Sequence, residues 1–228
     1  KVIGTQIGAD AFLGKPFNDQ ELNSLVRNLL SLKIREREVE ALNHQLTEVV
    51  LKRYLPPDLV DQIVSGETTL DQEPQDMSVT VLFTDLVGFT KMTEYLRARR
   101  MARVLNEYLT AMNDVIYEHG GTIDKFIGDA IMVIFGAPSP MLPQDQSARA
   151  SACALGMQAR MDALNRRWAE DDIPELKMRI GIHHGPVVVG TFGSEKRSDY
   201  TAIGPTVNMA SRIEATCEPG EVFISGEV

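Results

Sequence analysis

Cysteine is scarce in this sequence, with only Cys153 and Cys217 among 228 residues. Both fall within helical or apolar patterns, so a disulfide framework is not expected and a reducing cytoplasm is the simpler setting. Long apolar runs are absent as well: none approaches the roughly 18–20 residues that a transmembrane helix needs, and no signal peptide opens the chain. We therefore expect a cytoplasmic protein with no membrane span in this part of its sequence.

Positive charge is also in deficit, because 32 Asp and Glu residues outweigh 23 Lys and Arg residues and leave a net charge of −9. Such a surface repels phosphates, so nucleic acid is not expected among the partners. The hydrophobic content of 43% is ordinary for a globular protein and can fill a sizeable core. The chain starts without Met and stops in a strand-like run, Glu221 to Ser225, so we expect a fragment of a longer protein.

The first 33 residues end in a predicted helix. Asn18 or Asp19 is a suitable cap for it, and leucines recur on one of its faces. These leucines are Leu22, Leu25, Leu29 and Leu32.

Residues 34–76 read as a linker. Residues 34–53 contain no Gly or Pro, and a three–four spacing of apolar residues fits a coiled-coil seam; a single amphipathic surface helix is the alternative. Pro56-Pro57 then breaks the helix, a short helix is predicted over residues 58–65, and a polar stretch reaches Asp76. The seam residues are Val39, Leu42, Leu46 and Val49.

From Ser78 onward, strands and helices alternate. Their order of strand, helix, two strands, helix and strand is ferredoxin-like, βαββαβ, which predicts an α+β sandwich with helices on one face of the sheet. Strands are expected at 79–83, on either side of the turn at 127–129, and at 178–182 and 186–190, with helices at 90–118, 145–168 and 205–216.

Two carboxylates follow apolar strands in this region. Asp85 precedes a glycine turn and a helix start, so it either holds a hard cation beside a phosphate-binding turn or caps the helix. Asp129 lies at a tight hairpin tip, where an Asp is common for reasons of turn geometry alone. If the two segments are neighbours in the sheet, both carboxylates reach one edge, where a pair of metal ions would relieve their repulsion.

A third segment, Tyr200 to Arg212, places Asn208 and Arg212 four residues apart on a predicted helix, so they share one face. Aimed together from a half-buried helix, an Asn and an Arg suit an anion or a developing charge. An exposed polar face is the alternative.

Taken in order and spacing, the three segments resemble the class III nucleotidyl cyclase domain, over residues 77–228. Lys52 to Val60 resembles the segment that often leads into such domains, within a linker at 34–76. Residues 1–33 resemble the tail of a response-regulator receiver domain, with Lys15-Pro16 similar to its last strand.

The resemblance implies an adenylate cyclase, which converts ATP to 3′,5′-cyclic AMP and pyrophosphate with two Mg²⁺ or Mn²⁺ ions per site. Asp85 and Asp129 would be the metal carboxylates, with the Leu86 carbonyl as a further ligand. The triphosphate would be held by Arg179 and by backbone amides at Gly88, Phe89 and Thr90. Arg179 could equally form a surface salt bridge.

The resemblance also assigns the remaining contacts. Asn208 would position the ribose, and Arg212 would stabilise charge on the α-phosphate. Lys125 and Thr201 match the pair that reads adenine. A Lys N–H can donate to adenine N1 and a Thr oxygen can accept from N6, whereas guanine reverses both patterns.

The implied assembly is a symmetric homodimer, since one hairpin tip cannot easily serve both ends of ATP through Lys125 and Asp129. Asp85, Asp129 and Arg179 would come from one chain, and Lys125, Thr201, Asn208 and Arg212 from the other. An upstream receiver or sensor domain, or a histidine kinase, is the expected regulatory partner. The family's further phosphate-binding lysine is expected beyond Val228.

Three alternatives remain open. A guanylate cyclase is disfavoured by Lys125 and Thr201. A catalytically silent domain that binds nucleotide or dimerises would lack one of the catalytic residues, all of which are present. A helix–turn–helix output domain is disfavoured by the acidic balance and by the strand-rich C-terminal region.

Overall fold

The structure, a computed structural model, describes residues 18–69, 73–194 and 196–228. It divides into two compact units, Lys1–Tyr54 and Leu55–Val228. The Lys15-Pro16 strand expected from the receiver resemblance lies outside the described residues. In the described part of the chain, no helix is both long and apolar enough to cross a membrane.

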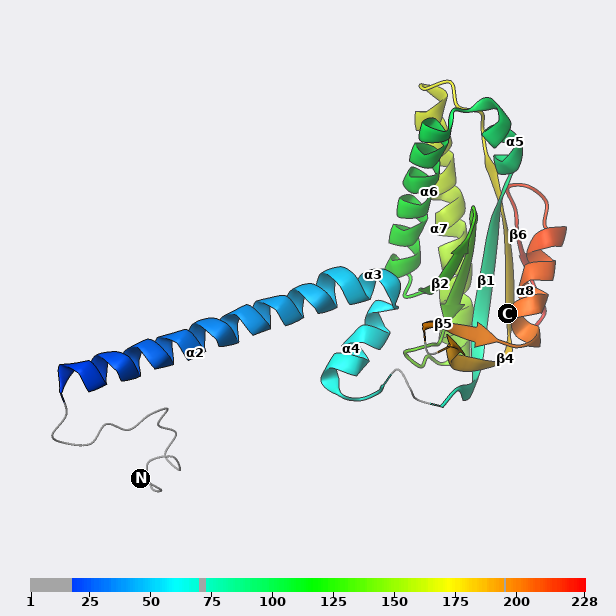
Figure 1. The fold of residues 1–228 in the computed structure, drawn as a ribbon. Coiled ribbons are helices and arrows are strands. Elements are labelled where there is room, and N and C mark those ends of the chain that lie inside the picture. The colour runs from blue at the N-terminus through cyan, green and yellow to red at the C-terminus, as the bar shows by residue number, and fades with distance from the viewer. Residues whose placement is uncertain (1–17, 70–72, 195) are drawn as a thin grey trace. The chain divides into compact units, whose positions relative to one another are not determined.

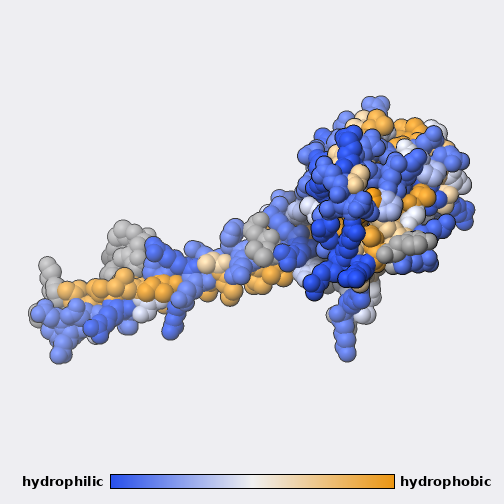
Figure 2. Space-filling view, turned by 90° about the horizontal axis from the view of Figure 1, so that it is seen from above, coloured by the Kyte–Doolittle hydropathy of each residue, from blue (hydrophilic) through white to orange (hydrophobic). Residues whose placement is uncertain are grey.

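The first unit is helical. Helix α2 (Asp19–Gln45) begins at Asn18, whose side chain accepts a hydrogen bond from the Glu21 amide at 2.8 Å, so the predicted cap is confirmed. The helix runs on into a π-helical turn, η1 (Leu46–Leu51), and a short α3 (Lys52–Tyr54). None of the α2 residues is buried, and Figure 2 shows an apolar band along this helix. Of the predicted seam, Val39, Leu42 and Leu46 are exposed, and the Val49 side chain lies outside the described residues.

The second unit begins with α4 (Pro57–Ser65) and is built on a mixed sheet (Figure 1). The strand order is β2-β3-β1-β4-β5, with β6 paired in parallel to β4. The first four of these give the ferredoxin-like arrangement, so that prediction is confirmed. The strands are β1 (Gln75–Val87), β2 (Thr122–Ile127), β3 (Ala130–Phe135), β4 (Lys177–Ser194), β5 (Arg197–Ile203) and β6 (Val222–Ile224).

Helices cover both faces of the sheet. The long helices α6 (Ala98–Glu118) and α7 (Pro143–Ala169) pack with alternate β1 residues, such as Leu82, into the larger core. Helix α8 (Pro205–Thr216) packs on the other face, where Ala210 joins a smaller core with Val81. Helices α6 and α7 thus share one face, as the ferredoxin-like order predicts, and α8, which follows that unit in the chain, covers the other face. Because both faces are covered, β1 is buried without alternation from Val79 to Thr84, as strands covered on two sides are.

Three further elements differ from the prediction. The expected helix 90–118 is split into α5 (Phe89–Tyr95) and α6, because Leu96 adopts an extended conformation. The strands expected at 178–182 and 186–190 are one strand, β4. Pro186 is paired with Ser78 of β1, and on its other side it lies between the β6 and β5 pairings, where its carbonyl accepts a hydrogen bond from Thr206. Strand β5 was not predicted.

Candidate active site

The sheet brings Asp85 and Arg179 face to face. They are register partners on the antiparallel strands β1 and β4, and Arg179 Nη2 lies 2.6 Å from Asp85 Oδ2. The hydrogen bond to Asp85 is the main cause that raises the pKa of Arg179. Both side chains are partly exposed, so the pair is open to an incoming ligand.

Asp129, on the turn between β2 and β3, reaches the same place. Its Oδ2 accepts a hydrogen bond from the Leu86 amide at 3.2 Å, which ties the hairpin tip to the end of β1. Burial raises the pKa of the Asp129 carboxyl, and the neighbouring Asp85 carboxylate raises it further. The expected meeting of the two carboxylates is therefore found.

These residues line one hollow of about 330 Å³. Gly88, with φ of +89°, turns the chain between β1 and α5 in a backbone conformation that glycine adopts without strain. The Phe89 side chain is buried in the larger core and does not line the hollow. The lining residues are Asp85, Leu86, Val87, Gly88, Thr90, Lys91, Asp129 and Arg179.

Glu214, a residue that the sequence analysis missed, completes this cluster from α8. Arg179 Nε lies 3.2 Å from Glu214 Oε1, and Arg179 Nη1 donates to the Ala215 carbonyl at 3.4 Å. Burial raises the pKa of Glu214, and the Arg179 charge opposes that rise. Arg179 is thus held by two acidic side chains from different elements. The sequence analysis named a surface salt bridge as the alternative role of Arg179. The observed salt bridges are partly buried.

Lys125 and Thr201 form a second cluster, away from the residues that line the hollow. They are joined by Asp124, which the sequence analysis also missed. Thr201 Oγ1 donates to Asp124 Oδ2 at 2.9 Å, and Lys125 Nζ lies 3.3 Å from the same oxygen. Thr201 is buried, the Asp124 side chain is fully buried, and the Lys125 side chain is 40% exposed.

A β-bulge explains why two consecutive residues of β2 can serve one cluster. The pairing with β3 shifts between Ile123 and Lys125, so Asp124 is the extra residue. Successive side chains of a regular strand point to opposite faces, and a bulge re-aims one of them. A bulge cannot be seen in the sequence, which is why Asp124 was not singled out.

Asn208 and Arg212 are exposed on α8. The buried face of α8 consists of Thr206, Ala210 and Glu214. Asn208 and Arg212 each lie two positions from these residues, which places them on the opposite side of the helix. The expectation that the pair points from a buried face is therefore wrong for the single chain. Among the residues that the structure describes, neither side chain has a hydrogen-bond partner, so both are available to a ligand or to another chain.

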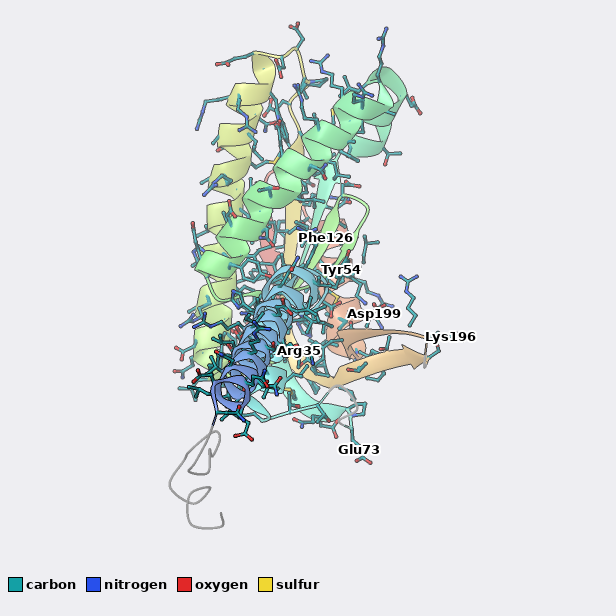
Figure 3. The ribbon with its side chains drawn as sticks, turned by 60° about the vertical axis from the view of Figure 1, so that its left-hand side comes forward. Arg35, Tyr54, Glu73, Phe126, Lys196 and Asp199 are labelled. Carbon is teal, nitrogen blue, oxygen red and sulfur yellow. The ribbon has the colours of Figure 1, made fainter. Side chains whose placement is uncertain are left out.

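Several residues that follow Lys125 and Thr201 closely in the sequence have exposed apolar side chains. Phe126 and Ile127 at the end of β2 are 47% and 53% exposed, and Ile203 at the end of β5 is 50% exposed. Figure 3 shows Phe126 on β2, and the β4–β5 hairpin projecting from the sheet with Lys196 at its tip and Asp199 on β5.

The comparisons with known proteins agree with this geometry. The family of adenylate and guanylate cyclase catalytic domains matches residues 71–228, and the chain belongs to this family. Over 161 residues it is 34% identical to adenylate cyclase 1 of Rhizobium meliloti (strain 1021), a match that covers 71% of this chain and 24% of that protein. The chain thus spans about a quarter of the length of the curated relatives it matches first.

Solved structures of both kinds of cyclase resemble it. The adenylyl cyclase CyaB from P. aeruginosa is 41% identical with a TM-score of 0.67, over 68% of this chain and 80% of that one. The guanylyl cyclase Cya2 is 44% identical with a TM-score of 0.65, over 68% of this chain and 77% of that one. Overall likeness to solved structures therefore does not separate an adenylate cyclase from a guanylate cyclase.

Proposed function

We propose that this domain converts ATP to 3′,5′-cyclic AMP and pyrophosphate at a site shared between two copies of the chain. The observation that carries the proposal is the division of the expected site residues into two clusters. Asp85, Asp129 and Arg179 surround one hollow, whereas Lys125 and Thr201 meet around Asp124.

The hollow suits divalent metal ions, which class III cyclase domains generally use. Two carboxylates meet there, and the raised pKa of Asp129 reflects burial and the repulsion from Asp85 that a cation would relieve. The described residues contain no group of three or more acidic, His or Cys side chains that could hold a metal alone. Asp85 and Asp129 would therefore hold two Mg²⁺ or Mn²⁺ ions together with the Leu86 carbonyl and substrate oxygens. When bound, the metals supply acidity to the ribose 3′-hydroxyl and charge neutralisation to the triphosphate.

The chain's own groups would orient the substrate. Arg179 lies beside the metal carboxylates and would turn to phosphate oxygens, while the amides at Gly88, Phe89 and Thr90 would receive the triphosphate. Asn208 would hold the ribose in line with the α-phosphate, and Arg212 would stabilise the charge that develops there. The exposure of these two α8 residues in a single chain fits a role at a contact with a second chain.

Adenine would be read by the second cluster. The Lys125 ammonium can only donate, as adenine N1 requires, and the Thr201 oxygen can accept from the N6 amino group. Guanine presents a donor at N1 and an acceptor at position 6, so this pair would mismatch at both atoms.

A symmetric homodimer would unite the two clusters. A two-fold axis brings the first cluster of each chain to the second cluster of its partner, which gives two equal sites. The exposed apolar residues at the ends of β2 and β5 are suitable for the interface between them.

We further propose that an upstream receiver or sensor domain, itself the target of a histidine kinase, regulates the cyclase through a coiled coil in residues 34–53. The support is the apolar band on α2, a helix that buries none of its residues in this chain.

The direct test is to incubate the full-length protein with ATP or GTP and Mg²⁺ or Mn²⁺, and to quantify both cyclic nucleotides. Cyclic AMP should dominate, and the Asp129→Asn variant serves as the inactive control. Dominant cyclic GMP would establish a guanylate cyclase instead, a candidate favoured by the likeness to Cya2. Nucleotide binding without either product would establish a silent domain.

A further inference from the structure

We infer that Asp124 sets the base preference of this site by fixing the direction in which the Thr201 hydroxyl hydrogen-bonds. The inference rests on the proposed function, because it assigns a role within the adenine-reading cluster. The observation is the hydrogen bond of 2.9 Å that Thr201 Oγ1 donates to Asp124 Oδ2.

A threonine hydroxyl does not by itself select adenine. It has one hydrogen and two lone pairs, so it can accept from an amino group or donate to a carbonyl oxygen. Adenine offers an amino group at position 6, and guanine offers a carbonyl oxygen there. Selection therefore depends on whether the single hydroxyl hydrogen is already engaged.

Among the described residues, the acceptors for this hydrogen lie within the chain itself. The two acceptors that Thr201 Oγ1 meets are Asp124 Oδ2 and, at 3.5 Å, the Ala202 carbonyl. An ionised carboxylate accepts and does not donate, so it leaves the Thr201 oxygen with its lone pairs alone for the ligand. Such an oxygen matches the adenine amino group and opposes the guanine carbonyl.

The Lys125 ammonium beside Asp124 favours the ionised carboxylate. Burial is the largest influence and raises the pKa of Asp124, while the Thr201 hydroxyl, the Lys125 ammonium and a backbone hydrogen bond at Ala202 limit that rise. Lys125 Nζ lies 3.3 Å from Oδ2, so the same carboxylate oxygen orients both base-reading side chains. Asp124 thus acts as a positioning residue for Lys125 and Thr201.

The arrangement is costly for stability, which argues against a purely structural role. The other oxygen, Asp124 Oδ1, is buried without a hydrogen-bond partner among the described residues. Burying a carboxylate with one oxygen unsatisfied is unfavourable, and an apolar residue of similar shape would avoid that penalty. If Asp124 only joined β2 to β5, a buried carboxylate would not be needed at this position.

The test uses the full-length protein and the variant Asp124→Val, which conserves volume and suits a strand. The measured quantity is the ratio of kcat/KM for ATP to that for GTP, together with the ratio of Kd values for their non-hydrolysable analogues. With the hydroxyl released to donate, both ratios should fall by about tenfold, within the usual range for an unpaired buried polar group. Asp124→Ala is the second variant if valine does not fit.

Two controls separate positioning from general damage. Thr80→Val removes another buried threonine hydroxyl from the sheet, one that bonds His184 at 3.0 Å, and should leave both ratios unchanged. In a Thr201→Val background, adding Asp124→Val should change the ratios much less than it does alone, because both residues act through one hydroxyl.

The outcomes distinguish the inference from the proposed function. If the unaltered protein prefers GTP, the proposed function is wrong. If it prefers ATP and Asp124→Val folds and keeps the same preference, the inference alone is overturned. Equal effects of Asp124→Val with and without the Thr201 hydroxyl would also overturn it, since Asp124 would then act by another route.

Discussion

Arg179 donates from Nη2 to Asp85 Oδ2 at 2.6 Å, across a directly opposed pair of residues on β1 and β4. A residue expected to bind phosphate is therefore paired, in this chain, with a residue expected to bind metal. Glu214 Oε1 lies 3.2 Å from Arg179 Nε, so Arg179 has a second acidic partner within this chain.

This pairing predicts opposite effects of Arg179→Ala on metal binding and on turnover. Removing the cation beside Asp85 should strengthen Mn²⁺ binding, so thermal stabilisation should begin at an Mn²⁺ concentration several-fold lower. Turnover should fall by about tenfold or more, because a phosphate contact and a charge are lost. The control is Arg103→Ala, which removes a pair of equal length, 2.6 Å to Asp171, on the exposed surface. Unchanged Mn²⁺ dependence would show that Arg179 does not compete with metal at Asp85.

A second prediction concerns the carboxylates themselves. Asp85→Asn and Asp129→Asn should each abolish turnover while leaving the unfolding temperature without metal nearly unchanged. Each should also remove the stabilisation that Mn²⁺ gives the parent protein, since an amide is a weaker ligand than a carboxylate. Asp162→Asn, an exposed change on α7, is the matched control. Turnover within tenfold of the parent in Asp129→Asn would rule out the two-metal assignment.

The shared site predicts complementation between two dead variants. Asp85→Asn and Asn208→Ala homodimers should each be inactive. After subunit exchange, one site of a mixed dimer carries both lesions and the other carries none, so roughly a quarter of all sites should recover. The assay mixes the two proteins and follows cyclic AMP. Background activity despite demonstrated mixed dimers would refute a site built from two chains.

Gly181 on β4 allows helix α8 to pack closely against the sheet, because it has no side chain there. A Cβ atom there would overlap the Glu214 amide nitrogen, so Gly181→Ala must push the helix away from β4. We expect a loss of about 1–3 kcal/mol of unfolding free energy, and a larger loss of turnover because Asn208 and Arg212 move with the helix. Gly226→Ala, where an added Cβ would meet no atom within 4 Å apart from its chain neighbours, should be nearly neutral. Denaturant unfolding measures the stability of both variants. Equal stabilities of Gly181→Ala and Gly226→Ala would show that α8 can move without a loss of unfolding free energy.

The linker prediction concerns Leu42 and Leu46, which are 58% and 47% exposed on the apolar band. Leu42→Asp with Leu46→Asp should weaken dimerisation by placing two carboxylates in the seam. Arg37→Asp with His44→Asp adds two carboxylates on the far side of the helix and should have a smaller effect. Sedimentation measures both. An unchanged dimer would leave association to the cyclase domain alone.

Much of the second unit could be read from periodicity and turns. The hairpin around Gly128 and the meeting of Asp85 with Asp129 followed from apolar strands that end in a carboxylate beside glycine. Helix α8 was predicted over the residues that it occupies, 205–216. The division of residues 90–118, the unity of β4 across Pro186 and the placement of α8 on the second face could not be read. Each depends on pairing and packing between segments distant in the chain, which no local pattern records.

The residue types of the candidate site were determined by the sequence alone, because Lys125, Thr201 and the two aspartates carry donors, acceptors and charges wherever they lie. Only the tertiary structure decided how those groups are used. A one-residue bulge turned Asp124 toward Thr201, and strand register placed Arg179 against Asp85. A hydrogen bond depends on distances of a fraction of an ångström, and those distances are set by how the strands pair rather than by which residues they contain.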